Sequence, residues 1–145
     1  MTSMTGRHLV ASLGVALVAG LGAVAMVGAA VGDARDPVMV EIEVHYSRFA
    51  PAVIEVPAGR PVTFVITNTD PIDHEWIVGD AALHERHRTG TEPVHDTRPT
   101  EVSLDAGATR RTTVTFDEPG TLTFICHLPG HEAYGMTGTL VVTPR

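Results

Sequence analysis

The sequence contains no lysine and only one cysteine, and both shortages exclude classes of protein. All ten basic residues are arginines, against 17 acidic residues, and the formal net charge is −7. A chain with this acidic balance lacks the basic surface that nucleic-acid binding requires. Cys126 stands alone, so no disulfide can form within the chain. The sequence also lacks the GxxxxGK, GxGxxG and GxSxG motifs, so the simplest nucleotide-binding and hydrolase functions are not expected.

One long hydrophobic run stands near the start of the chain. Leu9–Val31 contains 23 residues without a charge, behind a polar start that carries Arg7. This arrangement is typical of an export signal, yet the run exceeds the roughly 7–15 apolar residues of an ordinary signal peptide. As a helix it would measure about 34 Å, enough to cross a bilayer core of about 30 Å. We therefore predict that residues 1–32 are a signal peptide or an uncleaved membrane anchor, and that the following domain lies outside the cytoplasm.

The rest of the chain shows the period-two pattern of β-strands. After a short polar link, residues 33–37, one folded domain is predicted over residues 38–145. Segments rich in Val, Ile, Thr and Phe alternate with turns that contain Gly and Pro, which favours an all-β sandwich or barrel. The predicted strands are Val38–Tyr46, Ala52–Val56, Val62–Asn68, His74–Gly79, Thr112–Phe116, Thr121–Cys126 and Thr137–Val142. A polar stretch, Asp80–Thr100, interrupts the spacing, and only Ala81–Arg88 within it has a helix-like pattern.

Four residues of types that bind soft metal ions stand at or near strand ends. Cys126 ends a predicted strand, and His131 and Met136 follow in a loop that contains Gly and Pro, while His74 begins a strand far upstream. Two imidazoles, a thiolate and a weak axial thioether form the ligand set of type 1 copper sites, because the sulfur ligands suit Cu(I) and imidazole suits both oxidation states. Zinc bound by the Cys and two His is the chemical alternative. Zinc would not need the Met, however, and structural zinc sites usually hold four Cys or His ligands.

The segment that holds these residues resembles the copper loop of the cupredoxins, the blue copper proteins. It reads CHLPGHEAYGM, with C-x4-H-x4-M spacing, and the upstream segment NTDPIDHEWIVG, Asn68–Gly79, resembles the part of cupredoxins that supplies the first His. The resemblance covers roughly Val38–Thr143. It implies a Greek-key β-sandwich of about eight strands. It also implies one Cu(I)/Cu(II) ion in a type 1 site, with the ligands His74, Cys126, His131 and Met136.

Two positions deserve comparison with the family pattern. Some cupredoxins carry Asn or Ser directly after the first His, where it ties the two ligand loops together, and here that residue is Glu75. His127 follows the Cys, as in a similar run of the multicopper oxidases, which use His residues on both sides of the Cys for a three-copper cluster. Ile125 precedes the Cys here, so that cluster is not expected. His127 is predicted to point outward or to support the site without binding metal.

Three further histidines lie in the polar stretch: His84, His87 and His95. Acidic residues stand near them: Glu85, Glu92 and Asp96. On a helix His84 and His87 would share one face, which allows a second, labile copper or zinc site, and a solvated polar loop is the other interpretation. His45 is expected at the surface. Trp76 shares a strand face with His74 and is expected either near the copper or in the core.

The resemblance implies an electron carrier. In such proteins copper cycles between Cu(I) and Cu(II), and electrons enter and leave through the ring of the C-terminal His ligand, here His131, within an apolar patch. We expect a monomer that meets redox partner proteins briefly, such as a membrane-bound oxidase or reductase. It would touch a membrane only through residues 1–32, and its place would be the periplasm, the exterior or the outer face of the cytoplasmic membrane.

The alternative is an extracytoplasmic protein for copper storage, delivery or resistance, which the extra histidines support. An enzyme is not expected, because a copper oxidase or nitrite reductase would need a second copper with an open position.

The apolar patch near His131 is predicted to contain Leu128, Pro129 and Ala133.

Overall fold

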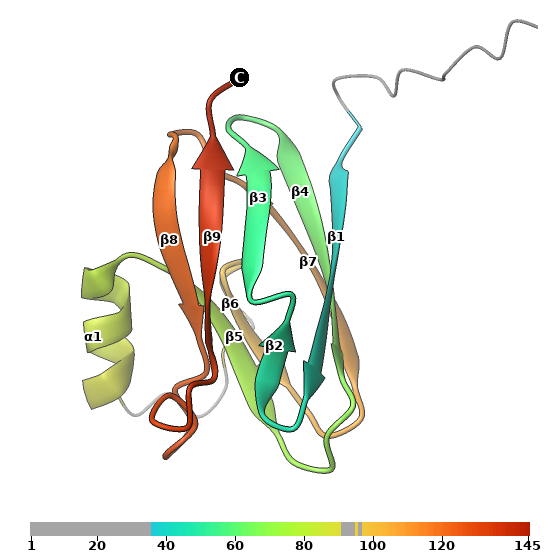
Figure 1. Ribbon diagram of the computed structural model, residues 1–145, viewed down its shortest axis with the longest axis vertical. Coiled ribbons are helices and arrows are strands. Elements are labelled where there is room, and N and C mark those ends of the chain that lie inside the picture. The colour runs from blue at the N-terminus through green and yellow to red at the C-terminus, as the bar shows by residue number, and fades with distance from the viewer. Residues whose placement is uncertain (1–35, 91–94, 96) are drawn as a thin grey trace, which may run out of the picture. The chain divides into compact units, whose positions relative to one another are not determined.

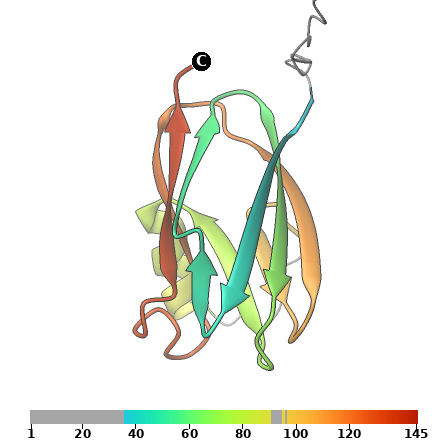
Figure 2. The same cartoon turned by 45° about the vertical axis from the view of Figure 1, so that its right-hand side comes forward.

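In the computed structural model, which describes residues 36–90, 95 and 97–145, the chain folds into two β-sheets packed face to face (Figures 1 and 2). These residues form nine strands and one helix. In chain order the elements are β1 (Val38–His45), β2 (Arg48–Ala50), β3 (Val53–Pro57), β4 (Pro61–Asn68), β5 (His74–Gly79), α1 (Ala81–Thr89), β6 (Glu101–Leu104), β7 (Thr109–Thr115), β8 (Gly120–Ile125) and β9 (Thr137–Thr143). The predicted all-β sandwich is confirmed.

The export or anchor segment predicted at residues 1–32 lies outside the described residues, as does most of the link that follows it. Within the part of the chain that the structure does describe, no helix is long and apolar enough to cross a membrane.

The two sheets have the crossed connections of a Greek key. The first sheet has four strands in the order β2–β1–β4–β7, and the second has five in the order β3–β9–β8–β5–β6. Neighbouring strands run antiparallel, except that β1 pairs with β4 and β3 pairs with β9 in parallel. Each parallel pair joins strands that are not consecutive in the chain, because the chain passes repeatedly from one sheet to the other.

Two strands were missed by the period-two pattern. β2 has three residues and β6 has four, which is too short for an alternation to be recognised. Glu101 and Val102 of β6 are moreover both buried, so the strand shows no exposed face. The helix-like pattern of Ala81–Arg88 is confirmed by α1, which extends one residue further.

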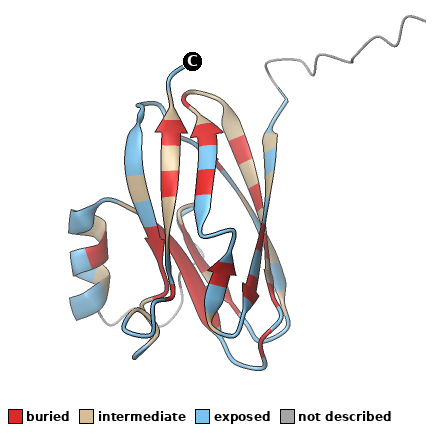
Figure 3. Cartoon of the chain, in the orientation of Figure 1, coloured by how far each residue is buried: buried red, intermediate tan, exposed pale blue. Residues whose placement is uncertain are grey.

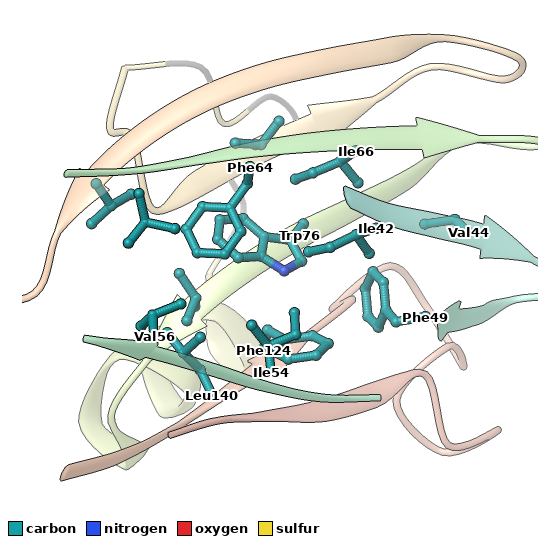
Figure 4. Close-up of a cluster of buried hydrophobic side chains, with 14 of the residues drawn as sticks. Ile42, Val44, Phe49, Ile54, Val56, Phe64, Ile66, Trp76, Phe124 and Leu140 are labelled. Carbon is teal, nitrogen blue, oxygen red and sulfur yellow. The ribbon is translucent and has the colours of Figure 1, made fainter. Parts of the chain in front are cut away.

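The core lies between the sheets and contains most of the aromatic side chains (Figure 4). Alternate residues of β4 point inward, and Val62, Phe64 and Ile66 are fully buried. The ring centroid of Trp76 lies 4.8 Å from that of Phe64 and 6.3 Å from that of Phe124. Of the two interpretations of Trp76, the structure therefore supports a core residue.

β5 is buried along both of its faces, as Figure 3 shows. One face points into the core, and α1 packs outside the five-stranded sheet (Figures 1 and 2). Asp80 caps this helix by accepting the N–H of Leu83 over 2.8 Å, which satisfies a donor that the first turn leaves unpaired. Because successive side chains of a strand point to opposite faces, neighbouring residues of β5 lie in two different buried environments.

Candidate metal centre

The structure brings three of the four predicted ligands together at one end of the sandwich. His74 begins β5, and Cys126 and His131 lie in the loop between β8 and β9. Nδ1 of His131 lies 3.1 Å from Nδ1 of His74 and 3.3 Å from Sγ of Cys126. Three ligand atoms in a plane around one ion, at bond lengths of about 2.0–2.3 Å, would be about 3.5–3.7 Å apart. The donor set and its spacing therefore fit one transition-metal ion.

Met136, the fourth predicted ligand, is fully buried at the end of the same loop. Its carbonyl accepts the N–H of Cys126 over 3.2 Å, and its own N–H donates to the carbonyl of His131 over 3.0 Å. These two hydrogen bonds fold the loop back on itself. The backbone of the Met thus lies beside the backbones of both loop ligands.

Glycines allow the loop to make its tight turns. Gly130 has φ of 87° and Gly135 has φ of 85°, values in the left-handed region that residues with a side chain rarely adopt. The N–H of Tyr134 donates to the carbonyl of Gly130 over 3.0 Å, and that of Gly135 donates to the carbonyl of Glu132 over 2.8 Å. The loop is therefore held by its own backbone hydrogen bonds, which help to position its ligands.

His74 is fixed by a carboxylate that sequence reasoning missed. Its Nε2 donates to Oδ2 of Asp70 over 2.9 Å, which leaves the lone pair on Nδ1, the atom that faces Cys126 and His131. Asp70 also accepts the N–H groups of Tyr46 and Ser47 over 2.7 and 2.8 Å. Burial raises the pKa of Asp70, but the hydrogen bonds from Ser47, Tyr46 and His74 outweigh burial and hold the pKa below its ordinary value.

Asn68 anchors the loop that carries Asp70. Its Oδ1 accepts the N–H of Asp70 over 3.0 Å, and its Nδ2 donates to the carbonyls of Ile72 and Asp105 over 2.9 and 3.0 Å. This side chain is buried, so its hydrogen bonds are shielded from water. The only sequence signal for either residue was the Asn-Thr-Asp-Pro run just before the first His, which is typical of a turn.

The environment of Cys126 determines the protonation state of its thiol. Burial raises the pKa of the thiol to about 11, while the N–H groups of Glu75 and Leu128 act in the opposite direction. The thiol is therefore protonated at neutral pH unless a metal ion displaces the proton. Burial, followed by the neighbouring His74, lowers the pKa of His131, which favours the neutral imidazole that a metal ion needs.

One edge of the centre reaches the surface. His131 is partly exposed, whereas His74 and Cys126 are buried. The loops between β1 and β2, between β4 and β5, and between β8 and β9 lie at the lower end of the sandwich in Figure 1. Each of these loops contains a large exposed apolar side chain: Tyr46, Ile72 and Tyr134. Of the predicted patch residues, Pro129 and Ala133 are exposed and Leu128 is half-buried against the core. We call these six residues together the apolar rim.

A second group of titratable side chains lies between α1 and the outer face of the five-stranded sheet. It contains four histidines and three glutamates: His84, His87, His95, His127, Glu75, Glu101 and Glu132. Since His84 and His95 are buried and the side chain of His87 is 8% exposed, the interpretation of a solvated loop is wrong for these three residues. Glu92 and Asp96, which were expected nearby, lie outside the described residues.

His127 belongs to this second group and does not point outward. Its side chain is only 3% exposed, and its Nε2 lies 2.9 Å from Nδ1 of His84. Burial, and then the charge of His84, lowers the pKa of His127 to about 4. The outward orientation considered from sequence is therefore wrong, because the residue after Cys126 points to the helix side of the sheet.

A Greek-key sandwich with two histidines and a cysteine converging at one end defines a cupredoxin-like domain. The chain belongs to this family: the model of the cupredoxin-like domain matches residues 15–142.

Two curated proteins show what the chain is similar to in sequence. The copper-resistant cuproprotein CopI of Pseudomonas aeruginosa is 30% identical over 138 residues, covering 72% of this chain and 76% of that protein. Auracyanin-B of Chloroflexus aurantiacus is 34% identical over 112 residues, covering 66% of this chain and 47% of that protein. The chain thus spans about three quarters of the first relative and about half of the second.

Two solved structures share the fold. Reduced auracyanin from Roseiflexus castenholzii has a TM-score of 0.63 and 23% identity, with 76% of this chain and 99% of that chain covered. A blue copper oxidase from Nitrosomonas europaea has a TM-score of 0.56 and 18% identity, with 76% of this chain and 40% of that chain covered. At these identities the likeness concerns the fold alone, and the fold occurs in an oxidase as well as in auracyanins.

Proposed function

We propose that the chain is an extracytoplasmic electron carrier that holds one copper ion in a type 1 site. The ligands are His74, Cys126, His131 and Met136. The observation that carries the proposal is the convergence of one Sγ and two imidazole nitrogens within 4.8 Å of one another. This donor set, with a buried Met on the same loop, suits copper in both oxidation states. A zinc site would not need the thioether of the Met.

Bound copper would supply a one-electron couple between Cu(I) and Cu(II). The protein keeps the ligands in place for both states. Asp70 holds the ring of His74, and the N–H of Glu75 donates to Sγ of Cys126 over 3.4 Å. A hydrogen bond to the sulfur withdraws electron density from it, which tunes the reduction potential. A rigid ligand frame favours rapid electron transfer because little rearrangement accompanies the change of charge.

The apolar rim lies in loops at the end of the sandwich where His131 is partly exposed, and it suits transient docking. Small, weak interfaces are typical of electron-transfer encounters, and an apolar contact around the exposed ring would exclude water along a short path to the copper. The partners are accordingly redox proteins, such as a membrane-bound oxidase or reductase, that meet a monomer of this chain. We propose no enzymatic activity for the type 1 site, because its four assigned ligands leave no coordination position for a substrate.

Copper handling is a second candidate. It is supported by the similarity to the copper-resistant cuproprotein CopI, which is 30% identical over 138 residues. In this role the chain would store, deliver or sequester copper outside the cytoplasm. The two roles differ in how readily the protein gives up its copper.

The copper site is tested by titrating the full chain with Cu(II) while recording visible absorption. We expect an intense blue thiolate-to-copper band that saturates at one copper and is bleached reversibly by a reductant. Cys126→Ser should abolish the band, since the thiolate is the absorbing ligand, and Met136→Ala should keep the band but shift the reduction potential. A wild-type chain that binds copper without this band would refute the type 1 assignment.

The two roles are separated by exposing the copper-loaded chain to a chelator of similar affinity. An electron carrier should retain its copper for hours while exchanging electrons rapidly with an added redox reagent. Rapid transfer of Cu(I) to the chelator would instead support copper handling.

A further inference from the structure

We propose that His87, His95 and Glu101 form a second metal site, which binds a borderline divalent cation such as Zn(II) or Cu(II). One ligand atom from each residue lies within 4.8 Å of the others. Oε2 of Glu101 lies 3.6 Å from Nε2 of His87 and 3.8 Å from Nδ1 of His95. The inference goes beyond the copper site and does not depend on it.

The ring of His87 is oriented as a ligand. Its Nδ1 donates to the carbonyl of Leu83, one helical turn earlier, over 2.9 Å. The lone pair of the neutral ring is then on Nε2, which faces the carboxylate of Glu101. This Nε2 is buried and has no hydrogen-bond partner, although buried polar atoms nearly always have one. A cation between Nε2 and the carboxylate, which lie 3.6 Å apart, would give this buried nitrogen a partner.

The other two ligands are held in a similar way. Nε2 of His95 lies 3.2 Å from Oε2 of Glu75, so a neutral ring that donates there carries its lone pair on Nδ1, toward Glu101. Oε1 of Glu101 accepts from Arg98 over 2.9 Å, which leaves Oε2 toward the two rings. Metal-binding histidines usually donate their second N–H to a carboxylate or carbonyl, and both rings follow this pattern.

The distances and charges also favour a cation over a plain network of ion pairs. Ligands around a tetrahedral ion at bond lengths of about 2.0–2.2 Å are about 3.3–3.6 Å apart. The gaps of 3.6 and 3.8 Å are close to this spacing and too long for hydrogen bonds. Glu75 and Glu101 are both buried, and Arg98 pairs with one oxygen of Glu101, so one positive charge stands against two buried carboxylates that need compensation. Two nitrogens and one carboxylate oxygen form a ligand set that Zn(II) and Cu(II) accept.

The site has a route to solvent and room for a further ligand. A cavity of about 800 Å³ is lined by Glu75, His87, His95 and His127, and also by three arginines, Arg86, Arg88 and Arg98. Such a volume admits a hydrated ion and allows a water molecule to complete the coordination. Nδ1 of His84 lies within hydrogen-bonding distance, 2.9 Å, of Nε2 of His127. Nε2 of His84 donates to the carbonyl of Thr123 over 3.2 Å. These two residues therefore frame the cavity and are not assigned as ligands.

The test uses the full chain with its copper site already filled by one equivalent of copper. The chain is dialysed against Zn(II), and in a parallel arm against a second equivalent of Cu(II), and bound metal is then counted by elemental analysis. Three variants are compared with the wild type: His87→Gln, Glu101→Gln and, as a matched control at an exposed His, His45→Gln. The blue band of the first copper reports in every sample whether the sheet ends remain folded.

We expect one additional metal ion per wild-type chain, with the blue band unchanged. His87→Gln and Glu101→Gln should weaken this second binding by roughly 10–100-fold or more, while His45→Gln should leave it intact. The arm with the tighter binding identifies the metal. Failure of the wild type to take up a second ion, displacement of the first copper by zinc, or equal binding by all three variants would each overturn the proposal. If the blue band is absent, zinc binding by Cys126→Ser still tests the second site separately.

Discussion

Glu75 contacts both clusters at once, through different parts of the residue. Its backbone N–H donates to Sγ of Cys126 over 3.4 Å, and its carboxylate lies 3.2 Å from Nε2 of His95 on the opposite face of β5. The sequence alone did not identify the contact between the two ligand segments, because Glu75 stands where some cupredoxins have Asn or Ser. The structure shows that the backbone of this residue makes a tie, so its side chain is available to the second cluster.

Asp70→Asn should weaken copper binding by roughly 10–100-fold, the usual effect of removing a partner that orients a metal-binding His. The amide would bind the ring of His74 less strongly and would not favour the tautomer with its lone pair on Nδ1. Affinity is measured by competition with a chelator. Asp73→Asn is the control, since Asp73 instead accepts the N–H of Ala106 over 2.9 Å. Equal affinities of the two variants would contradict the role of Asp70.

Copper affinity should rise with pH. The pKa of Cys126 is about 11 without metal, so the thiol is protonated between pH 6 and 8 and must lose its proton when copper binds. The apparent binding constant should then increase about tenfold for each pH unit in this range. Competition titrations at several pH values, corrected for protonation of the chelator, give the slope. Cys126→Ser should lose this dependence, and a flat profile for the wild type would refute the prediction.

Gly138→Ala should destabilise the domain by about 1–3 kcal/mol, the usual cost of overpacking. A Cβ at this position would overlap the ring of Phe124 and would lie 2.8 Å from the carbonyl oxygen of Ala52. Gly120→Ala, also in the second sheet, meets nothing within 4 Å and should be close to neutral. Denaturant unfolding of both variants checks the difference, which vanishes if Phe124 can move away at no cost.

A charge in the apolar rim should slow electron exchange between copies of the protein. Ala133→Asp places a carboxylate in the exposed loop beside His131, in a chain whose formal net charge is already −7. Like-charge repulsion at the contact should lower the self-exchange rate by about tenfold or more, with the blue band unchanged. Thr121→Asp, at the far end of β8, is the control. A similar slowing in both variants would show that net charge, and not the rim, limits the exchange.

The sequence was sufficient where the information is local. Alternating apolar residues predicted seven of the nine strands in the described part of the chain, and the spacing from Cys126 to His131 and Met136 marked the candidate loop ligands. Period and spacing are properties of a few neighbouring residues, so they can be recognised without knowledge of the fold. The strands β2 and β6 are too short to carry such a pattern, and they were missed for that reason.

Strand periodicity and the types of metal-binding residues are encoded residue by residue, so the type of fold and the candidate copper ligands could be predicted without a structure. The side chains that these residues contact depend on the tertiary structure. Asp70 reaches His74 through the turn of a loop, and His87, His95 and Glu101 come together only because α1 packs on the outer face of the sheet. Such contacts depend on strand order, register and helix docking, which cannot be predicted from a local sequence pattern.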